Sequence, residues 1–167
     1  MIRPSLQTLG IALLAASPLF ASAQLSANVT LTSNYKFRGQ DQDLGRTGGL
    51  KPALQGGFDY SFGDSGFYVG NWNSSVNWLP GNSLESDFYG GYKFKAGEVD
   101  LDVGALAYVY SGNRSGNTTE LYGAATYGPL TAKYSHTVSE DYFGYAGART
   151  SNRSGRNTGY LNLAFAQ

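Results

Sequence analysis

The chain has 167 residues, with 12 basic and 12 acidic side chains, 23 glycines, 13 tyrosines, no cysteine and a mean hydropathy of -0.29. This composition is too polar for membrane-spanning helices, because no internal stretch approaches the ~20 apolar residues that one span requires. The absence of cysteine argues against a disulfide-stapled module, and the balanced charge gives no reason to expect a nucleic-acid partner.

The one long apolar run lies at the N-terminus, where Arg3 precedes residues 9–20 and the small residues at positions 21–23 follow. This order is typical of a secretory signal peptide, here cleaved after Ala23. We therefore divide the chain into a signal peptide at residues 1–23 and one domain at residues 24–167. The exported domain carries 11 basic and 12 acidic side chains, since Arg3 leaves with the signal.

Apolar and polar residues alternate from Leu25 onward. In the first segment, residues 25–38, the apolar positions are Leu25, Ala27, Val29, Leu31, Tyr35 and Phe37. Side chains on a strand point to opposite faces in turn, so this pattern predicts a strand with one apolar and one wet face. A half-buried strand of a soluble protein would show the same alternation. The choice between a barrel strand in lipid and a strand packed on a soluble core therefore depends on the pattern of the whole chain.

Seven further strands are predicted at residues 51–62, 67–78, 84–95, 99–110, 118–127, 130–139 and 157–165. Tight turns between them alternate strictly with longer connections at residues 40–50, 79–83, 111–117 and 140–156. Bacterial transmembrane barrels have short periplasmic turns and longer external loops. The sequence therefore predicts an all-β, antiparallel up-and-down transmembrane barrel of about eight strands in the bacterial outer membrane.

Aromatic residues on the predicted apolar face support a lipid-facing wall. They fall at the turn end (Tyr60, Phe62, Tyr68, Tyr92, Phe94 and Tyr127) and at the loop end (Tyr35, Phe37 and Trp78). Amphipathic rings favour the headgroup region of a membrane, so two aromatic girdles are expected. The alternative is that tyrosine is simply a favourable strand residue.

The opposite face carries charges of both signs, which the barrel would direct into its lumen. These candidates are Lys36, Arg38, Asp59, Glu85, Asp87, Lys93, Lys95, Asp100, Asp102, Glu120 and Lys133. A turn at Ala96 and Gly97 would place Lys93 directly across from Asp100, a favourable cross-strand pair. Mixed charge fits either a solvated channel or a cross-braced plug.

Five segments together resemble the proteobacterial Gcw_chp family of conserved hypothetical proteins. They are residues 33–39 (SNYKFRG), 52–60 (PALQGGFDY), 65–76 (SGFYVGNWNSSV), 85–92 (ESDFYGGY) and 119–127 (TELYGAATY). The resemblance implies an outer-membrane barrel without an established activity. It also implies further hairpins and a C-terminal strand ending in an aromatic residue, so a truncated part of a larger barrel is an alternative to a closed eight-stranded one.

The strongest catalytic candidate is Ser135 beside His136, with Glu140 and Asp141 following. Neighbouring strand residues face opposite ways, which would place Ser135 in the lumen and His136 towards lipid, so we expect no enzyme. Asp41, Asp43 and Gly45 match only part of a calcium loop, and a solvated loop is the simpler interpretation. One histidine and no cysteine make a transition-metal site unexpected, and we expect no metal and no cofactor.

The tetrapeptide Asn-Arg-Ser-Gly occurs at residues 113–116 and again at residues 152–155, in loops on the same predicted end. These loops and their neighbours contain Arg46, Arg114, Arg149, Arg153 and Arg156. Guanidinium groups bind phosphate bidentately, so the loops are candidates for contact with lipopolysaccharide or another anionic ligand. Flexible loops kept soluble by charge would carry the same residues.

Three functions remain open from the sequence. They are a small porin-like channel for polar solutes, a non-transporting structural or surface ligand-binding barrel, and an outer-membrane hydrolase, in that order. A charged lumen favours a wet pore, whereas a small strand number favours a filled interior. The expected partners are outer-membrane lipid, lipopolysaccharide and small polar solutes; the sequence does not predict an oligomeric state.

Overall fold

A computed structural model describes residues 24–45, 49–147 and 153–166 of the chain. The signal peptide predicted at residues 1–23 lies outside the described residues. Across the described ranges, no helix is both long enough and apolar enough to cross a membrane.

Eight antiparallel strands form one sheet. They are β1 (Gln24–Thr32), β4 (Ala53–Ser61), β5 (Phe67–Ser75), β6 (Leu84–Ala96), β7 (Val99–Tyr110), β8 (Thr118–Tyr127), β9 (Leu130–Thr137) and β10 (Gly159–Phe165). Each pairs with the next in that order, which confirms the predicted all-β, up-and-down arrangement. Two short strands, β2 (Lys36–Phe37) and β3 (Gln40–Asp41), form a separate hairpin, and η1 (Gly63–Ser65) and η2 (Arg114–Gly116) are single 3-10 turns.

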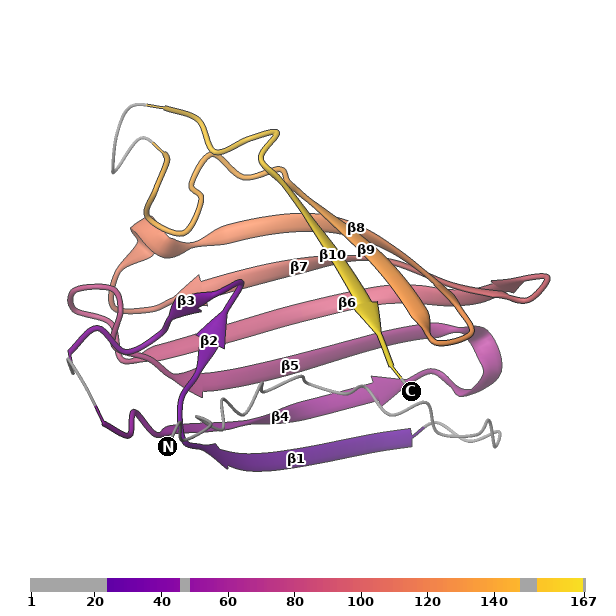
Figure 1. Ribbon diagram of the computed structural model, residues 1–167, viewed down its shortest axis with the longest axis horizontal. Helices are drawn as coiled ribbons and strands as arrows, with labels where there is room; N and C mark the ends of the chain where they lie inside the picture. The colour runs from indigo at the N-terminus through magenta and orange to yellow at the C-terminus, as the bar shows by residue number, and fades with distance from the viewer. Residues whose placement is uncertain (1–23, 46–48, 148–152, 167) are drawn as a thin grey trace, which may run out of the picture.

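Short and long connections alternate between the two ends of the sheet, as the sequence predicted. Figure 1 shows the tight turns at the right and the long connections, including the one that contains β2 and β3, at the left. We call these the turn end and the loop end. In the described residues β1 and β10 do not pair with each other, so the sheet is not closed into a barrel.

The two faces of the sheet differ in polarity along every strand. Apolar side chains of the outer face are exposed, with Val29 76%, Phe58 57% and Leu163 68% accessible. Residues between them in sequence, such as Glu85 and Glu120, lie buried on the inner face. The period-two alternation of the sequence therefore corresponds to two real faces.

The inner face curves around the β2–β3 hairpin. Tyr35, just before β2, contacts Trp72 of β5 and Glu85 of β6. Phe37 of β2 packs against Tyr108 of β7, and the following arginine reaches β8 and β10. One hairpin can touch five strands only if the sheet wraps around it. The hairpin therefore fills the loop end of the interior.

This hairpin corrects the predicted first strand. The alternation at residues 25–38 suggested one continuous wall strand, but β1 ends at Thr32 and the chain turns inward. Arg38 and Gly39 both have positive φ (49° and 82°), as a two-residue type I′ turn requires, and they join β2 to β3. Lys36 and Arg38 thus belong to the hairpin and not to the wall.

Glycines on the inner face make room for tyrosine rings of neighbouring strands. Gly104 of β7 lies opposite Tyr122 of β8, and a Cβ at Gly104 would come within 2.5 Å of both the Tyr122 hydroxyl and the Gly90 carbonyl oxygen. Gly91 stands in the same relation to Tyr68. An aromatic ring that covers a strand glycine in this way fixes the pairing register.

Candidate functional site

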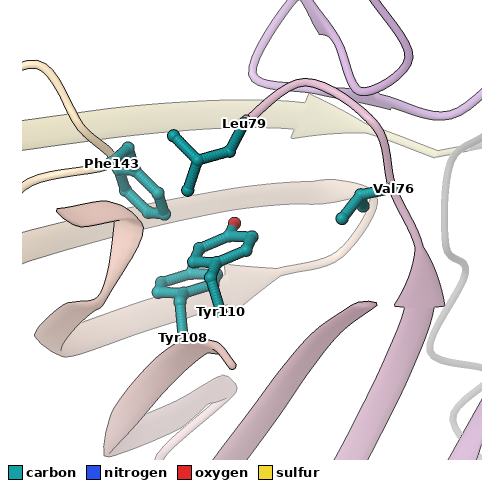
Figure 2. Close-up of a cluster of buried hydrophobic side chains, with 5 residues drawn as sticks. All are labelled: Val76, Leu79, Tyr108, Tyr110 and Phe143. Atoms are coloured by element: carbon teal, nitrogen blue, oxygen red, sulfur yellow. The ribbon is translucent and has the colours of Figure 1, made fainter. Parts of the chain in front are cut away.

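The loop end of the interior has its own hydrophobic core. Val76, Leu79, Tyr108, Tyr110 and Phe143 form a cluster of buried side chains, which come from β7, the β5–β6 connection and the β9–β10 connection (Figure 2). Tyr110 is 1% exposed and packs edge-on against Trp78 with ring centroids 5.3 Å apart. Such packing excludes water from this end of the interior.

Aromatic residues predicted for the outer girdle at the loop end belong to this core instead. Tyr35, Phe37 and Trp78 pack against the buried cluster. Tyr68, predicted on the outer face at the turn end, points inward and donates to Asp102 Oδ1 at 2.7 Å. Of the other turn-end aromatics, Phe62, Tyr92, Phe94 and Tyr127 are exposed, and Tyr60 is half-buried. The aromatic residues predicted for the outer face thus lie there at the turn end, apart from Tyr68, but not at the loop end.

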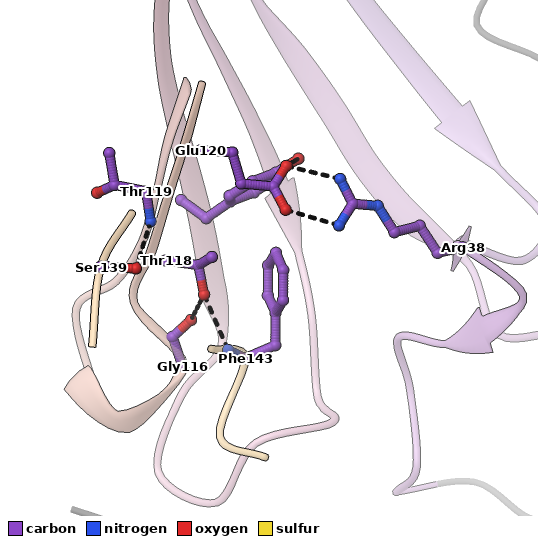
Figure 3. Close-up of polar contacts among 8 residues, drawn as sticks. Arg38, Gly116, Thr118, Thr119, Glu120, Ser139 and Phe143 are labelled. Carbon is purple, nitrogen blue, oxygen red and sulfur yellow. Dashed lines mark hydrogen bonds and ion pairs between the residues drawn. The ribbon is translucent and has the colours of Figure 1, made fainter. Parts of the chain in front are cut away.

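Arg38 connects the hairpin to the wall. Its two terminal nitrogens donate to the two carboxylate oxygens of Glu120 on β8, at 2.7 and 2.6 Å (Figure 3). Side-chain exposure is 13% for Arg38 and 2% for Glu120. Burial lowers the pKa of Arg38, but the bond to Glu120 raises it with a net increase, so the guanidinium stays charged. This bidentate pair is the central polar contact of the site.

Three aromatic rings surround the same guanidinium. The carbon at its centre lies 4.3 Å from the ring centroid of Tyr160, 4.8 Å from that of Phe37 and 5.7 Å from that of Phe143. Cations are attracted to the faces of such rings. Arg38 therefore holds together the hairpin, β8, β10 and the connection before β10.

Thr118, at the start of β8, fixes that last connection. Its hydroxyl donates to the carbonyl oxygen of Gly116 at 3.1 Å and accepts from the backbone N–H of Phe143 at 2.8 Å (Figure 3). The side chain is buried, so both bonds are shielded from water. Phe143, with a positive φ of 44°, is thereby held over the hairpin.

Two buried carboxylates lie deeper on β6. Glu85 accepts a hydrogen bond from Tyr35 and pairs across the strands with Tyr110, and Asp87 lies two residues further along the same face. Within the described part of the chain, Glu85 Oε2 and Asp87 Oδ1 have no hydrogen-bond partner. The region next to the core is therefore rich in buried carboxyl groups and tyrosine hydroxyls.

The turn end of the inner face carries a second polar network. Tyr68 bonds both Asp102 and Tyr122, and Tyr89 donates to Asp59 at 2.5 Å. Lys93 lies over the Tyr68 ring and Lys133 over the Tyr122 ring, with nitrogen-to-centroid distances of 4.6 and 3.9 Å. Both lysines reach these rings from the inner face, where the sequence predicted them.

The strand register corrects the predicted partner of Asp100. The turn occupies Gly97 and Glu98, so Ala96 pairs with Val99, Lys95 with Asp100, and Lys93 with Asp102. Lys95 Nζ lies 2.5 Å from Asp100 Oδ1, and both side chains are more than half exposed. The prediction was wrong by one pair because it placed the turn one residue too early.

The remaining hairpin charges form a local contact. Lys36 is exposed on β2, whereas Lys51 Nζ contacts Asp41 Oδ2 at 2.8 Å and the carbonyl oxygen of Asp43 at 2.9 Å. The hydrogen bond from Lys51 lowers the pKa of Asp41. A lysine thus takes the place that a cation would need in the partial calcium loop. In the described ranges, no group of three or more histidine, aspartate or glutamate residues could hold a metal ion.

The loop arginines are described only in part. Arg114 on η2 and Arg153 and Arg156 before β10 are exposed at the loop end, and Arg156 lies 3.8 Å from Glu140. Arg46 and Arg149 lie outside the described residues. The predicted gathering of all five arginines stays a prediction.

Ser135 and His136 face opposite ways on β9. Ser135 is buried on the inner face, while His136 approaches Tyr134 and Asn157, each at 3.3 Å. The structure does not bring these two side chains together as nucleophile and base.

Sequence reasoning did not identify the pairing of Arg38 with Glu120 or the tyrosine network of the inner face. The sequence did contain one signal for the Arg38–Glu120 pairing. Arg38-Gly39 between two-residue strands fits a hairpin turn. The alternation of residues 25–38 concealed it, because the hairpin strands preserve the same period.

Comparison with known proteins gives one family. The model described as "Bacterial protein of unknown function (Gcw_chp)" matches residues 15–167. Neither a curated protein nor a solved structure matches the chain.

Proposed function

Because the chain belongs to the Gcw_chp family of bacterial proteins of unknown function, we propose its function from its architecture: a bacterial outer-membrane barrel, closed at its loop end, that binds a ligand there without conducting solutes. The β2–β3 hairpin is the observation that carries this proposal. It is held in the interior by the Arg38–Glu120 pair and by packing on Tyr108 and Phe143.

Lipid contact is supported by the exposed apolar outer face. Leucine, valine and phenylalanine side chains project from the outer face along the sheet, from Leu25 on β1 to Phe165 on β10. A water-soluble protein rarely leaves so extensive an apolar surface uncovered. A tryptophan at Phe88, in a variant lacking Trp72 and Trp78, should be quenched by lipids brominated on their acyl chains.

Native Trp72, on the inner face, is the matched control for that experiment. A variant that keeps only Trp72 should be quenched much less, since its indole is separated from lipid by the wall. Equal quenching of the two variants would argue against the proposed orientation.

Closure of the barrel is supported by the composition of its two edges. Neither β1 (QLSANVTLT) nor β10 (GYLNLAF) contains a charged residue or a proline, which natural edge strands use to block further pairing. Backbone groups at such edges must be satisfied inside a membrane. We therefore propose that β1 and β10 pair with each other.

Engineered cysteines test the closure directly, because the chain has none of its own. Asn28→Cys would be combined in turn with cysteine at Tyr160, Asn162 or Ala164, all on inner positions of β10. One register of the three should give an intramolecular disulfide after oxidation. Covalent dimers in its place would show that the edges pair between two copies.

The absence of conduction is tested in planar bilayers. We expect the wild-type protein to give no discrete current steps, because the hairpin and its core block the loop end. Deletion of residues 36–41 should produce steps. Discrete steps from the wild type would refute the closed-interior proposal.

A channel for polar solutes is the second candidate, favoured by the charged turn end of the interior. Lys95 and Asp100 are exposed there, and Asp102 and Lys133 lie further inside. This function would require the hairpin to move. It predicts wild-type conductance that changes with Lys93→Gln or Asp100→Asn.

Lipopolysaccharide is the proposed partner of the loop surface. Arg114 and Arg153 are exposed at this end, where bidentate contact with lipid phosphates would be possible. Replacing both with serine should weaken binding to lipopolysaccharide vesicles and reduce its salt dependence. Unchanged binding would exclude these two side chains as the phosphate contacts.

A further inference from the structure

A small cavity lies at the loop end, between the hairpin, the connection before β10, and β10 itself. Its volume is about 150 Å³, and seven of its ten lining residues are aromatic. Phe37, Trp78 and Tyr110 contribute rings from the hairpin, the β5–β6 connection and β7, while Tyr145 and Tyr160 contribute rings from the β9–β10 connection and β10. Aromatic rings from several elements around one space suit a flat or ring-shaped ligand.

The size limits the ligand to a single ring. A water molecule in the liquid occupies ~30 Å³, so the cavity has the volume of about five waters. This is smaller than the ~300–1,000 Å³ of typical sites for drug-sized ligands. One six-membered sugar ring is of the right order, whereas an extended oligosaccharide would have to continue outside.

Charge around the cavity disfavours an anion. Arg38 is the one cationic side chain in the lining, and Glu120 already occupies both of its terminal nitrogens. Tyr110, also in the lining, is the cross-strand neighbour of the buried Glu85. The lining therefore offers no uncompensated positive charge, unlike the exposed loop arginines.

The polar groups in the lining suit hydroxyl groups. Gln40 and Gln42 both line the space, and an amide presents donors and an acceptor together, as each sugar hydroxyl does. The Tyr145 hydroxyl bonds Gln40 Oε1 across one side of the cavity. Within the described residues, Trp78 Nε1 is buried without a hydrogen-bond partner.

We propose that this cavity binds one pyranose ring of a neutral sugar at the loop end. The inference deepens the proposed function and rests on it, since it names the ligand class of the site that the hairpin closes. Aromatic rings would contact the C–H faces of the sugar, and the glutamine amides would exchange hydrogen bonds with its hydroxyls.

Trp78 reports on binding once Trp72 is removed. Refolded Trp72→Phe protein would be titrated with methyl glucopyranoside and methyl galactopyranoside while Trp78 fluorescence is recorded. We expect a saturable change in the millimolar range for at least one of them. Glucuronate, which has the same ring with a carboxylate, should bind about tenfold more weakly, because the cavity offers no uncompensated cation.

Tyr145→Ala is the informative variant. Tyr145 is largely exposed and lines the cavity from a connection, so its loss should leave the fold intact. One ring contact corresponds to roughly a two- to tenfold change in affinity. Tyr127→Ala, which removes an exposed tyrosine at the turn end of β8, is the matched control and should leave affinity unchanged.

Three results would overturn the inference: no saturable change with either glycoside, glucuronate binding as tightly as they do, or cyclohexanol binding more tightly than they do. Equal loss of affinity in the Tyr127 and Tyr145 variants would also contradict it. The bilayer measurement separates this inference from the proposed function. If the protein neither conducts nor binds sugars, only the proposed ligand is refuted. If the protein conducts, the proposed closed interior is refuted.

Discussion

Replacing Arg38 with alanine should leave the buried carboxylate of Glu120 without its cationic partner. Two charge-assisted hydrogen bonds of 2.7 and 2.6 Å would disappear while Glu120 stays 2% exposed. Breaking a buried ion pair from one side costs about 3–5 kcal/mol. Loss of the cation–π contacts with Tyr160 and Phe37 should lower the free energy of unfolding as well, by about 0.5–2 kcal/mol.

The assay is urea unfolding of the refolded protein, monitored by tryptophan fluorescence and by heat-modifiable gel migration. If the hairpin and wall unfold together, the free energy of unfolding should fall by about 3–5 kcal/mol in Arg38→Ala. If the hairpin detaches alone, the midpoint will stay and current steps will appear in planar bilayers. Either change follows from the loss of this contact.

A double variant separates the pair from its surroundings. Arg38→Met combined with Glu120→Leu removes both charges and keeps most of the side-chain volume. Exchanges of this kind are commonly neutral or stabilising, so the double variant should recover most of the lost stability. The reasoning is refuted if Arg38→Ala changes neither unfolding nor conductance, or if the double variant is less stable than the single one.

Three further predictions concern other parts of the fold. Gly104→Ala should lower the free energy of unfolding by about 1–3 kcal/mol, because its Cβ would collide with a tyrosine hydroxyl and a backbone oxygen; Gly123→Ala, where nothing lies within 4 Å, is the control, and equal losses would contradict the packing argument. The lowered pKa of Asp41 means that its pair with Lys51 stabilises the fold above the ordinary carboxyl pKa of about 4, a contribution lost as pH falls through the lowered value. Asp41→Asn should therefore flatten the acid dependence of the urea midpoint, and an unchanged slope would exclude the pair as its source. Lys95→Gln should change stability by less than about 1 kcal/mol, since its partner is also exposed, and a larger loss in urea unfolding would show that the pair is shielded.

The strands were predictable because their signal is local. Strand side chains alternate with a period of two, and each predicted wall segment from residue 51 onward overlaps an observed strand. Alternating turn and loop lengths then determine the order in which strands pair. Neither signal depends on knowing which residues meet across the interior.

The contents of the interior could not be predicted in the same way. Tyr35 and Phe37 continue the apolar phase of β1, and only the inward turn after Thr32 separates them from the wall. Glu120 is one of several acidic residues on the inner face, and its partner lies 82 residues away in the sequence. Pairs of that separation depend on how the sheet curves, which the alternation does not encode.

The inner and outer faces of the same strands have different surroundings and need different side chains. The outer face, from Leu25 to Phe165, exposes apolar side chains, whereas the inner face packs a core around Tyr110. A cluster of buried aromatic residues and a bidentate ion pair shielded from water are not expected in a wide solvated interior. An inner core at one end and charged residues at the other fit a site that opens towards the loops, with the hairpin as its floor.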